Sequence, residues 1–116
     1  MLHFSIALPC EAQGIIDRYL MKPSGSHGRA RFFEGVNARL AITGVGSLPS
    51  AIATTALGIR YPNSNAIWLN VGICGHRNAA IGEVFIANRV STDTSRDNIY
   101  PQSPWKSPFK GIELVT

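Results

Sequence analysis

Short apolar runs alternate along the chain with segments of helical periodicity. The first run, HFSIAL (residues 3–8), is apolar enough for a buried strand, and Pro9 ends it. In the next segment, EAQGIIDRYLMK, apolar residues recur at the spacing of one helical face. That face consists of Ile15, Ile16, Tyr19 and Leu20. The N-terminus therefore predicts a strand, a tight turn and a helix.

Two further strands and a second helix are expected in the following part of the chain. PSGSHGR (residues 23–29) is typical of a loop or hairpin connection, whereas RFFEG and ARLAITG predict strands joined by a hairpin across residues 35–37. SLPSAIATTALG then predicts a helix of small residues, with Ser47 as its N-cap and Pro49 in its first turn. Gly58 is the expected stop of this helix.

Beyond the second helix the pattern predicts two more strands and a long irregular segment. AIWLNVG is apolar without alternation, as buried parallel strands are, and EVFIANRV (residues 83–90) predicts another strand. From Ser91 to Lys110 polar residues and prolines dominate, so we expect a loop that lines a pocket or an interface. Trp105 and Phe109 either stack on a base or cover the sheet, and we favour a role in covering the sheet.

The predicted order is strand, helix, two strands, helix, two strands. Helices between apolar strands indicate an α/β fold with a mixed, partly parallel central sheet flanked by helices. The chain of 116 residues suits one domain, residues 1–116. Ligands of such sheets bind beyond the carboxyl ends of parallel strands. The loops expected there are PCE, GVGS and GICGH, and they define the candidate site.

Composition narrows the class of protein. With 45% hydrophobic and 16% charged residues the chain is expected to be globular. It has neither a stretch of roughly 20 apolar residues that could span a bilayer nor the pattern of a signal peptide, so we expect a cytoplasmic protein with no membrane partner. The net charge of +4 comes from scattered Lys and Arg residues, and no nucleic-acid partner is expected.

The candidate site offers a carboxylate, a glycine-rich turn and a histidine. Glu11 follows an apolar strand, where it serves either as a general base or only as a partner of the helix dipole. GVGS lets the backbone approach an anion or a sugar, or forms only a tight turn. His76 binds a base or phosphate, or is a solvated loop residue. Cys74 and His76 have too few partners for a metal site, and no cofactor is expected. Cys10 and Cys74 lie among apolar residues and are expected to be reduced core residues.

Three motifs carry a family resemblance. ALPCEAQGIID, LAITGVGSLPSAIATT and WLNVGICGHRNAAIGEVFIANRV follow one another in the order and spacing of the purine nucleoside phosphorylase and nucleosidase superfamily. This superfamily includes the methylthioadenosine/S-adenosylhomocysteine nucleosidases. The resemblance covers about the first ninety residues and implies a phosphorylase/hydrolase-like sheet wrapped by helices. It also implies cleavage of the N-glycosidic bond of a purine-type nucleoside.

The resemblance assigns roles to residues of all three loops. Glu11 resembles the carboxylate that activates the attacking water in the nucleosidases. The glycine-rich turn near the sugar and nucleophile corresponds to Gly44, Val45 and Gly46, with Ser47 opening the helix behind it. The strand-end loop that borders the nucleophile and base pockets corresponds to Asn70, Gly72, Ile73, Cys74 and Gly75.

Departures from the family pattern bear on the nucleophile. Many phosphorylases of the superfamily have Arg at the position of Asn70 and Ser at the position of Ile73, and both serve phosphate. An amide without charge and an apolar side chain do not replace them, so water is the expected nucleophile. Phosphate remains the alternative, because Arg77 or Arg29 could reach the pocket from a loop.

The family's second half supplies a Met-Glu segment that holds the ribose and a Ser-Asp pair whose Asp protonates the base. Neither occurs in residues 1–116, so we expect a truncated, N-terminal portion of a nucleosidase-like domain that is weakly active or inactive alone. We also expect a homo-oligomer, since a truncated sheet leaves an edge and an apolar face uncovered. The rival hypotheses are a nucleoside-binding module without chemistry and a structural domain that binds no nucleoside.

Overall fold

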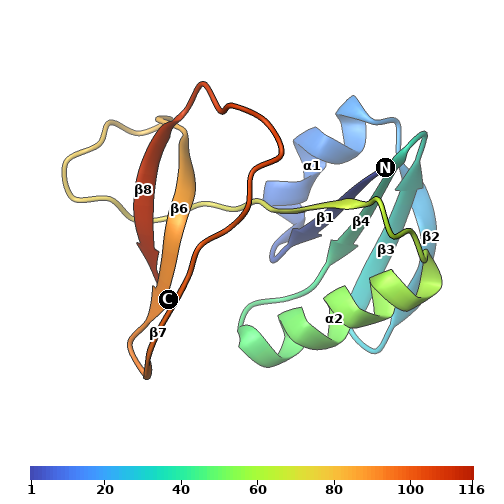
Figure 1. Ribbon diagram of the computed structural model, residues 1–116. Helices are drawn as coiled ribbons and strands as arrows, with labels where there is room; N and C mark the ends of the chain where they lie inside the picture. The colour runs from blue at the N-terminus through green and yellow to red at the C-terminus, as the bar shows by residue number, and fades with distance from the viewer. The chain divides into compact units, whose positions relative to one another are not determined.

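The chain forms two compact units, Met1–Gly75 and His76–Thr116 (Figure 1). The computed structural model describes residues 1–116, apart from the side chains of residues 95 and 96. The elements are, in order, β1 (Leu2–Ile6), α1 (Pro9–Arg18), β2 (Lys22–His27), β3 (Ala30–Gly35), β4 (Ala38–Ile42), α2 (Ser47–Arg60), β5 (Ile67–Asn70), β6 (Phe85–Thr92), β7 (Ser95–Ile99) and β8 (Lys110–Val115).

The N-terminal unit is built on one mixed sheet with the strand order β2-β3-β4-β1-β5. β1 runs parallel to β4 and β5, whereas β2, β3 and β4 are antiparallel neighbours. The hairpin expected at residues 35–37 joins β3 to β4, and Asn37 takes a positive φ of 56° in its turn. The predicted mixed, partly parallel sheet flanked by helices is confirmed.

β2 was expected as a loop or hairpin connection and is an edge strand. Its sequence, KPSGSH, is poor in residues that favour strands, but its backbone pairs with β3 around a register shift between Pro23 and Gly25. Pairing with a neighbouring strand outweighs local propensity, and an edge strand tolerates proline because one side of it needs no ladder hydrogen bonds.

Two apolar layers cover the two faces of this sheet. Alternate residues of a strand point to opposite faces, so β1 and β4 face both helices. The α1 layer consists of Phe4, Ile6, Ala12, Met21, Ala38, Leu40 and Ile42. The α2 layer is centred on Ala30, Phe32, Ala41, Ala53 and Leu57. Packing on both faces fixes the parallel strands, and with them the loops at their carboxyl ends.

The predicted face of α1 is right for three residues and wrong for one. Ile15, Ile16 and Tyr19 pack against the α1 layer. Leu20 is 83% exposed, because the helix ends at Arg18 and Leu20 takes a φ of 50° in the turn that follows. A left-handed residue leaves the helical path, so periodicity no longer sets the direction of its side chain.

Both predicted boundaries of α2 are wrong. Gly46 is the N-cap, and Ser47 is the first helical residue. The helix also continues past Gly58 to Arg60. A Cβ atom at Gly58 would lie 3.5 Å from the Trp68 ring, an ordinary van der Waals distance, so this position lies where α2 packs on β5.

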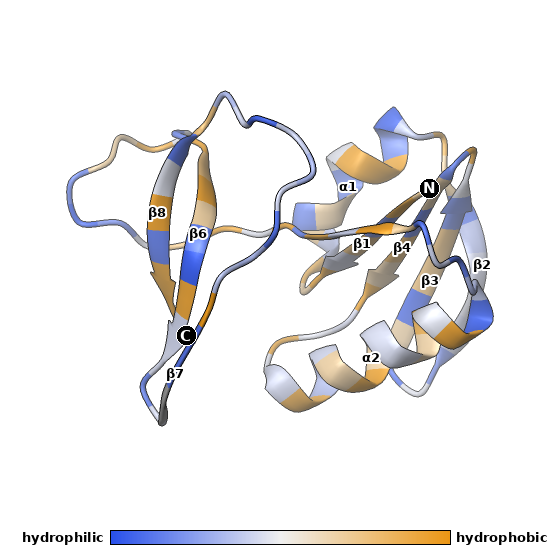
Figure 2. Cartoon of the chain, viewed as in Figure 1, coloured by the Kyte–Doolittle hydropathy of each residue, from blue (hydrophilic) through white to orange (hydrophobic). Residues whose placement is uncertain are grey.

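α2 has an unusually apolar surface. Hydrophobic residues are spread along it, and hydrophilic ones gather at its C-terminal end (Figure 2). Leu48 is 69% exposed and Ile59 is 76% exposed, while Arg60 is the first charged residue of the helix. No helix in the described part of the chain is both long and apolar enough to cross a membrane.

β5 is an edge strand, contrary to the prediction that it is buried. β1 pairs with one side of it, and none of the described residues forms a strand on its other side. Its residues alternate between half-buried and exposed, and Trp68 is 42% exposed. An apolar run without alternation indicates burial on both faces only where the strand lies inside the sheet.

The C-terminal unit contains a sheet with the order β7-β6-β8. β6 begins two residues later than the strand expected at residues 83–90, and β7 lies within the segment Ser91–Lys110, which was expected to be irregular throughout. β6 pairs in parallel with β8, and Arg89 of β6 donates a hydrogen bond to Glu113 of β8. That bond lowers the pKa of Glu113.

Candidate functional site

The loops that follow β1, β4 and β5 all begin at the C-terminal ends of these parallel strands, on the same side of the sheet. In the register of the parallel strands, Ile6 of β1 lies beside Ile42 of β4, and Ser5 lies beside Asn70 of β5. The backbone N–H of Thr43 donates to the Ile6 carbonyl at 2.8 Å. The three loops predicted from the sequence as a candidate site therefore start from adjacent strand ends.

Glu11 connects two of these loops. It lies in the first turn of α1, and its Oε2 accepts the backbone N–H of Leu8 at 3.0 Å. Its Oε1 accepts the backbone N–H of Ile73, in the loop after β5, also at 3.0 Å. A carboxylate offers about four lone-pair sites, so two of them are left for a water or a substrate hydroxyl.

Gly72 allows the Glu11 carboxylate to lie against the β5 loop. A Cβ atom at residue 72 would lie 3.2 Å from Glu11 Oε1, which is closer than ordinary van der Waals contact. At Gly75, three residues further along the same loop, an added Cβ would meet nothing within 4 Å. Only at the first of these glycines would an added side chain press on the Glu11 carboxylate.

We expect Gly72→Ala to weaken the Glu11–Ile73 hydrogen bond and to lower the free energy of unfolding by about 1 kcal/mol, a typical net value for one hydrogen bond. Gly75→Ala is the matched control. It should leave stability unchanged or raise it by about 0.4–1 kcal/mol, because alanine restricts the unfolded chain. Urea unfolding measures both variants, and equal effects would contradict the role given to Gly72.

The turn after β4 contains two glycines with positive φ. Gly44 has a φ of 84° and Gly46 a φ of 110°, a region that residues with a side chain rarely adopt. Val45 between them is 72% exposed. Ser47 follows as the first residue of α2, whose first N–H groups point toward this end of the helix. Such a turn suits an anion or a sugar hydroxyl.

The cysteines are not core residues, contrary to the prediction. Cys10 and Cys74 are both unpaired thiols, and both are exposed. Cys10 lies in the first turn of α1 and Cys74 in the loop after Ile73, and neither position faces an apolar layer. Cys10 directly precedes Glu11 in the sequence and Cys74 directly follows Ile73, the two residues joined by a hydrogen bond.

His76 belongs to the C-terminal unit, where it organises its own loop. Its Nδ1 accepts the backbone N–H groups of Asn78 at 3.1 Å and Ala79 at 2.9 Å, and its ring stacks on Phe85 with centroids 5.1 Å apart. With Nδ1 occupied as an acceptor, only the Nε2–H can contact a ligand. No group of three His, Cys, Asp or Glu side chains among the described residues could hold a metal ion.

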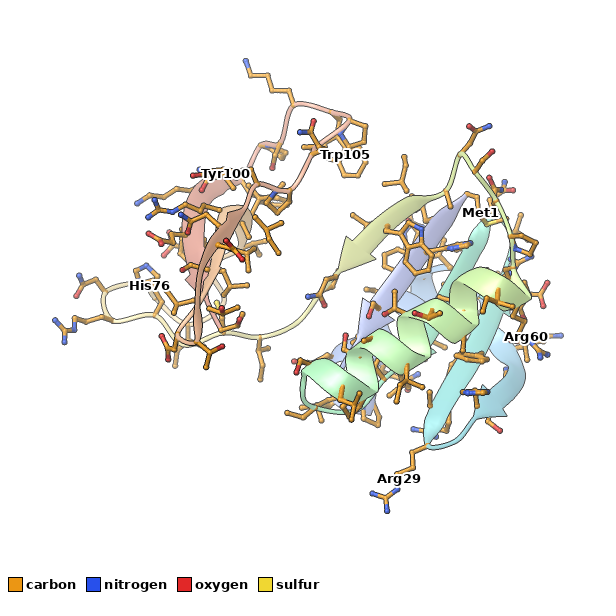
Figure 3. The ribbon with its side chains drawn as sticks, turned by 60° about the horizontal axis from the view of Figure 1, so that its bottom comes forward. Met1, Arg29, Arg60, His76, Tyr100 and Trp105 are labelled. Carbon is orange, nitrogen blue, oxygen red and sulfur yellow. The ribbon has the colours of Figure 1, made fainter. Side chains whose placement is uncertain are left out.

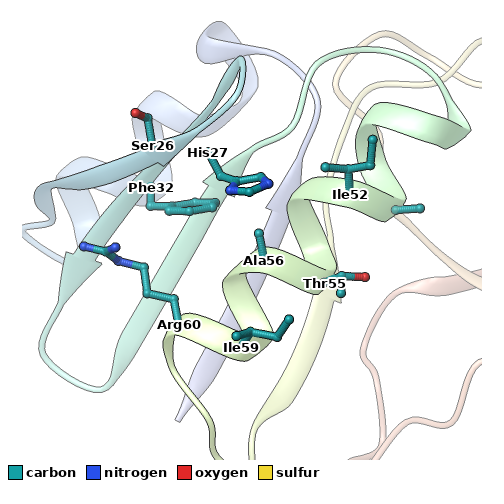
Figure 4. Close-up of a pocket in the computed structure, with 9 residues that line it drawn as sticks. Ser26, His27, Phe32, Ile52, Thr55, Ala56, Ile59 and Arg60 are labelled. Carbon is teal, nitrogen blue, oxygen red and sulfur yellow. The ribbon is translucent and has the colours of Figure 1, made fainter.

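A groove lies elsewhere, between α2 and the β2–β3 hairpin (Figure 4). It has a volume of about 630 Å³ and contains none of the site residues predicted from the sequence. Phe32 and Ile52 contribute apolar surface from its two sides, and Arg60 lies at one end. The absence of charge from SLPSAIATTALGI is the signal in the sequence that could have revealed this surface.

A smaller cavity of about 240 Å³ adjoins this groove and shares His27 and Ile52 with it. It reaches Thr43 at the end of β4 and Pro49 in the first turn of α2. Arg29, at the tip of the β2–β3 hairpin, also lines it (Figure 3). This cavity therefore lies between the tip of the hairpin and the start of α2.

The mixed sheet, the two helices and the three strand-end loops define the class: the chain has the nucleoside phosphorylase/nucleosidase fold. One solved structure that it resembles is a point mutant of Helicobacter pylori MTAN with 5'-methylthioadenosine in the active site. The TM-score is 0.68 at 15% sequence identity, over 98% of this chain and 62% of that chain. No family model and no curated protein matches the sequence. At this identity the likeness establishes the fold, and activity has to be inferred from the site.

Proposed function

We propose that this chain is the nucleophile-side portion of an enzyme that cleaves the N-glycosidic bond of a purine-type nucleoside with water. The observation that carries this proposal is the fixed Glu11 carboxylate, which accepts backbone N–H groups from Leu8 and Ile73 at the ends of two parallel strands. The structural neighbour supports it, since that protein holds 5'-methylthioadenosine in its active site.

In the proposed reaction Glu11 accepts a proton from water while the water oxygen bonds to C1′ of the ribose. The C1′–N bond breaks, and its electron pair leaves with the base, which must then gain a proton. The two backbone N–H groups on Glu11 orient the carboxylate before water binds. Gly44 and Gly46 supply an open backbone turn for the sugar.

Residues 1–116 contain no Ser-Asp pair like the one that protonates the base in the resembled family. Loss of a general acid costs about 10²- to 10⁴-fold in rate, so we propose that the chain alone is weakly active or inactive. The chain spans 62% of the length of the MTAN structure that it matches. The assignment of residues 1–116 to one larger domain and the cytoplasmic location also stay predictions.

Water is favoured over phosphate as the nucleophile at the strand ends. Ile73 is 82% exposed and presents an apolar side chain, and Asn70 is an exposed amide at the end of β5. Neither offsets the charge of a phosphate dianion. One observation favours the phosphorylase as second candidate: Arg29 lines the smaller cavity together with Thr43 and Pro49, close to the start of α2.

Nucleoside binding separates these enzymes from a purely structural domain. Titrating the ¹⁵N-labelled chain with 5'-methylthioadenosine should shift the amide signals of Gly44, Gly46 and Ile73, which lie in two of the three loops. Tyr100 and Trp105, in the C-terminal unit, report on unspecific binding. If no amide shifts, the structural-domain hypothesis gains; if the loop amides shift and no base is ever released, the non-catalytic binding module gains.

We further propose that the chain forms a homo-oligomer through α2. The exposed side of α2 carries an apolar stripe. Two large residues, Leu48 and Ile59, lie toward its ends, and two small residues, Ala51 and Thr55, lie between them. If two copies pack antiparallel about Thr55, Ile59 of one copy lies opposite Ala51 of the other. A large residue then faces a small one on each side of the axis, and the same surface of α2 serves both copies, as a two-fold interface requires.

A further inference from the structure

His3 is a buried titratable residue outside the candidate site. It lies on β1, its side chain is 1% exposed, and neither ring nitrogen has a hydrogen-bond partner. A buried imidazole without partners is costly when neutral and far more costly when charged. The folded sheet therefore favours the neutral form of His3.

The positive charges that act on His3 disfavour its protonation. The nearby carboxylate is paired with an arginine. β4 presents Arg39, which lies beside His3 in the strand register, and the amino terminus adds a second positive charge. Glu34 of β3 is bound to Arg39 at 2.9 Å. α2 has no titratable residue before Arg60. Burial lowers the pKa of His3 most, and the two positive charges lower it further.

β5 depends on this part of β1. The Trp68 ring of β5 packs edge-on against the His3 ring, with centroids 4.7 Å apart. β1 is the strand that pairs with β5, and the Ile67 N–H of β5 donates to the Met1 carbonyl at 3.0 Å. The chain after β5 leads directly to Ile73, whose N–H is held by Glu11. A series of contacts therefore connects His3 with the candidate site.

We propose that protonation of His3 releases the edge strand β5 from β1 and so detaches the Ile73 amide from Glu11, which makes the candidate site sensitive to acid. The charged ring can be hydrated only if it moves out of the sheet, and this movement breaks its contact with Trp68. The release of β5 stands on the structure of the sheet alone, and only its effect on catalysis rests on the function proposed for Glu11.

The direction of the pH effect follows from the pKa. Since the pKa of His3 is lowered in the folded sheet, the released state binds the proton more tightly. The closed state is favoured above the ordinary histidine pKa of about 6.5 and is lost as the pH falls through the lowered value. One proton is involved, so the opening constant rises about tenfold per pH unit within that window.

Hydrogen exchange of the β5 amides tests the release. Between about pH 7.5 and about pH 5.5, the protection factors of Ile67 and Leu69 should fall severalfold, with about tenfold as the ceiling for one proton, while that of Leu40 in β4 should change little. His3→Phe keeps a ring against Trp68 and has no titratable group, so its β5 protection should not depend on pH. His3→Gln is the second neutral variant, should the phenylalanine not fold. An unchanged β5 protection in the natural chain at about pH 5.5 would overturn the proposal.

Fluorescence gives an independent reading on the same residue. The chain has two tryptophans, and Trp105→Phe leaves Trp68 as the single reporter. Its emission should follow one titration, which His3→Phe abolishes. A titration that persists in His3→Phe and disappears in His27→Gln or His76→Gln would assign the effect to those exposed residues and refute the role of His3. No nucleoside is needed, so the outcome is independent of the proposed enzyme activity.

Discussion

Glu11→Gln is expected to lower base release from a purine nucleoside by about 10²- to 10⁴-fold, the usual contribution of a general base. The amide keeps the size of the side chain but cannot accept a proton from water. It also places an NH₂ group against one of the two backbone N–H groups that the carboxylate now accepts, from Leu8 or Ile73. The rate is measured on the longest available product of the same gene, because the chain alone is expected to be weak.

Asp17→Asn is the matched control for this experiment. Asp17 lies on the same helix, is exposed, and hydrogen-bonds Gln13, so its replacement removes the same charge away from the strand ends. The control should retain full activity. If Glu11→Gln were also fully active, Glu11 would be only the partner of the Leu8 and Ile73 amides, and the proposed base would have to lie elsewhere.

Ile59→Glu is expected to abolish self-association of the chain. Ile59 is 76% exposed and lies on the apolar stripe of α2, which contains no charge before Arg60. In a two-fold interface one substitution buries two carboxylates, and an unpaired buried charge costs several kcal/mol. At about 1.4 kcal/mol per factor of ten, the dimer should weaken by at least a hundredfold.

Sedimentation equilibrium measures this change directly. Val36→Glu is the control. Val36 is 82% exposed on the β3–β4 hairpin, so this substitution adds the same charge at a position away from α2. That variant should associate like the natural chain. Loss of association in Val36→Glu with retention in Ile59→Glu would place the interface on the hairpin side and contradict the role of α2.

The main features of the fold were predictable because local pattern and tertiary packing agree there. Helical periodicity placed Ile15 and Ile16 on the buried side of α1, and the hairpin after β3 forms at the expected residues. Expectations failed where distant residues decide. The position of β5 at the sheet edge, for example, exposes a run whose pattern indicates burial.

The sequence indicated which loops form the candidate site, but not the hydrogen bonds between them. Parallel strands bring the ends of β1, β4 and β5 together, which their apolar runs and crossover helices indicate. The hydrogen bond from Ile73 to Glu11 joins residues 62 positions apart, and no local pattern reports such a contact. The same holds for His3, whose burial without partners follows from the strands and helix packed around it.

Base release from 5'-methylthioadenosine, with and without phosphate, tests the central claim most directly. We expect release by the longest product of the gene at a rate that phosphate does not change, because Asn70 and Ile73 offer a phosphate ion neither charge nor a donor hydroxyl. A requirement for phosphate would contradict hydrolysis and make the enzyme a phosphorylase. Tight binding without release in either condition would contradict the enzyme itself.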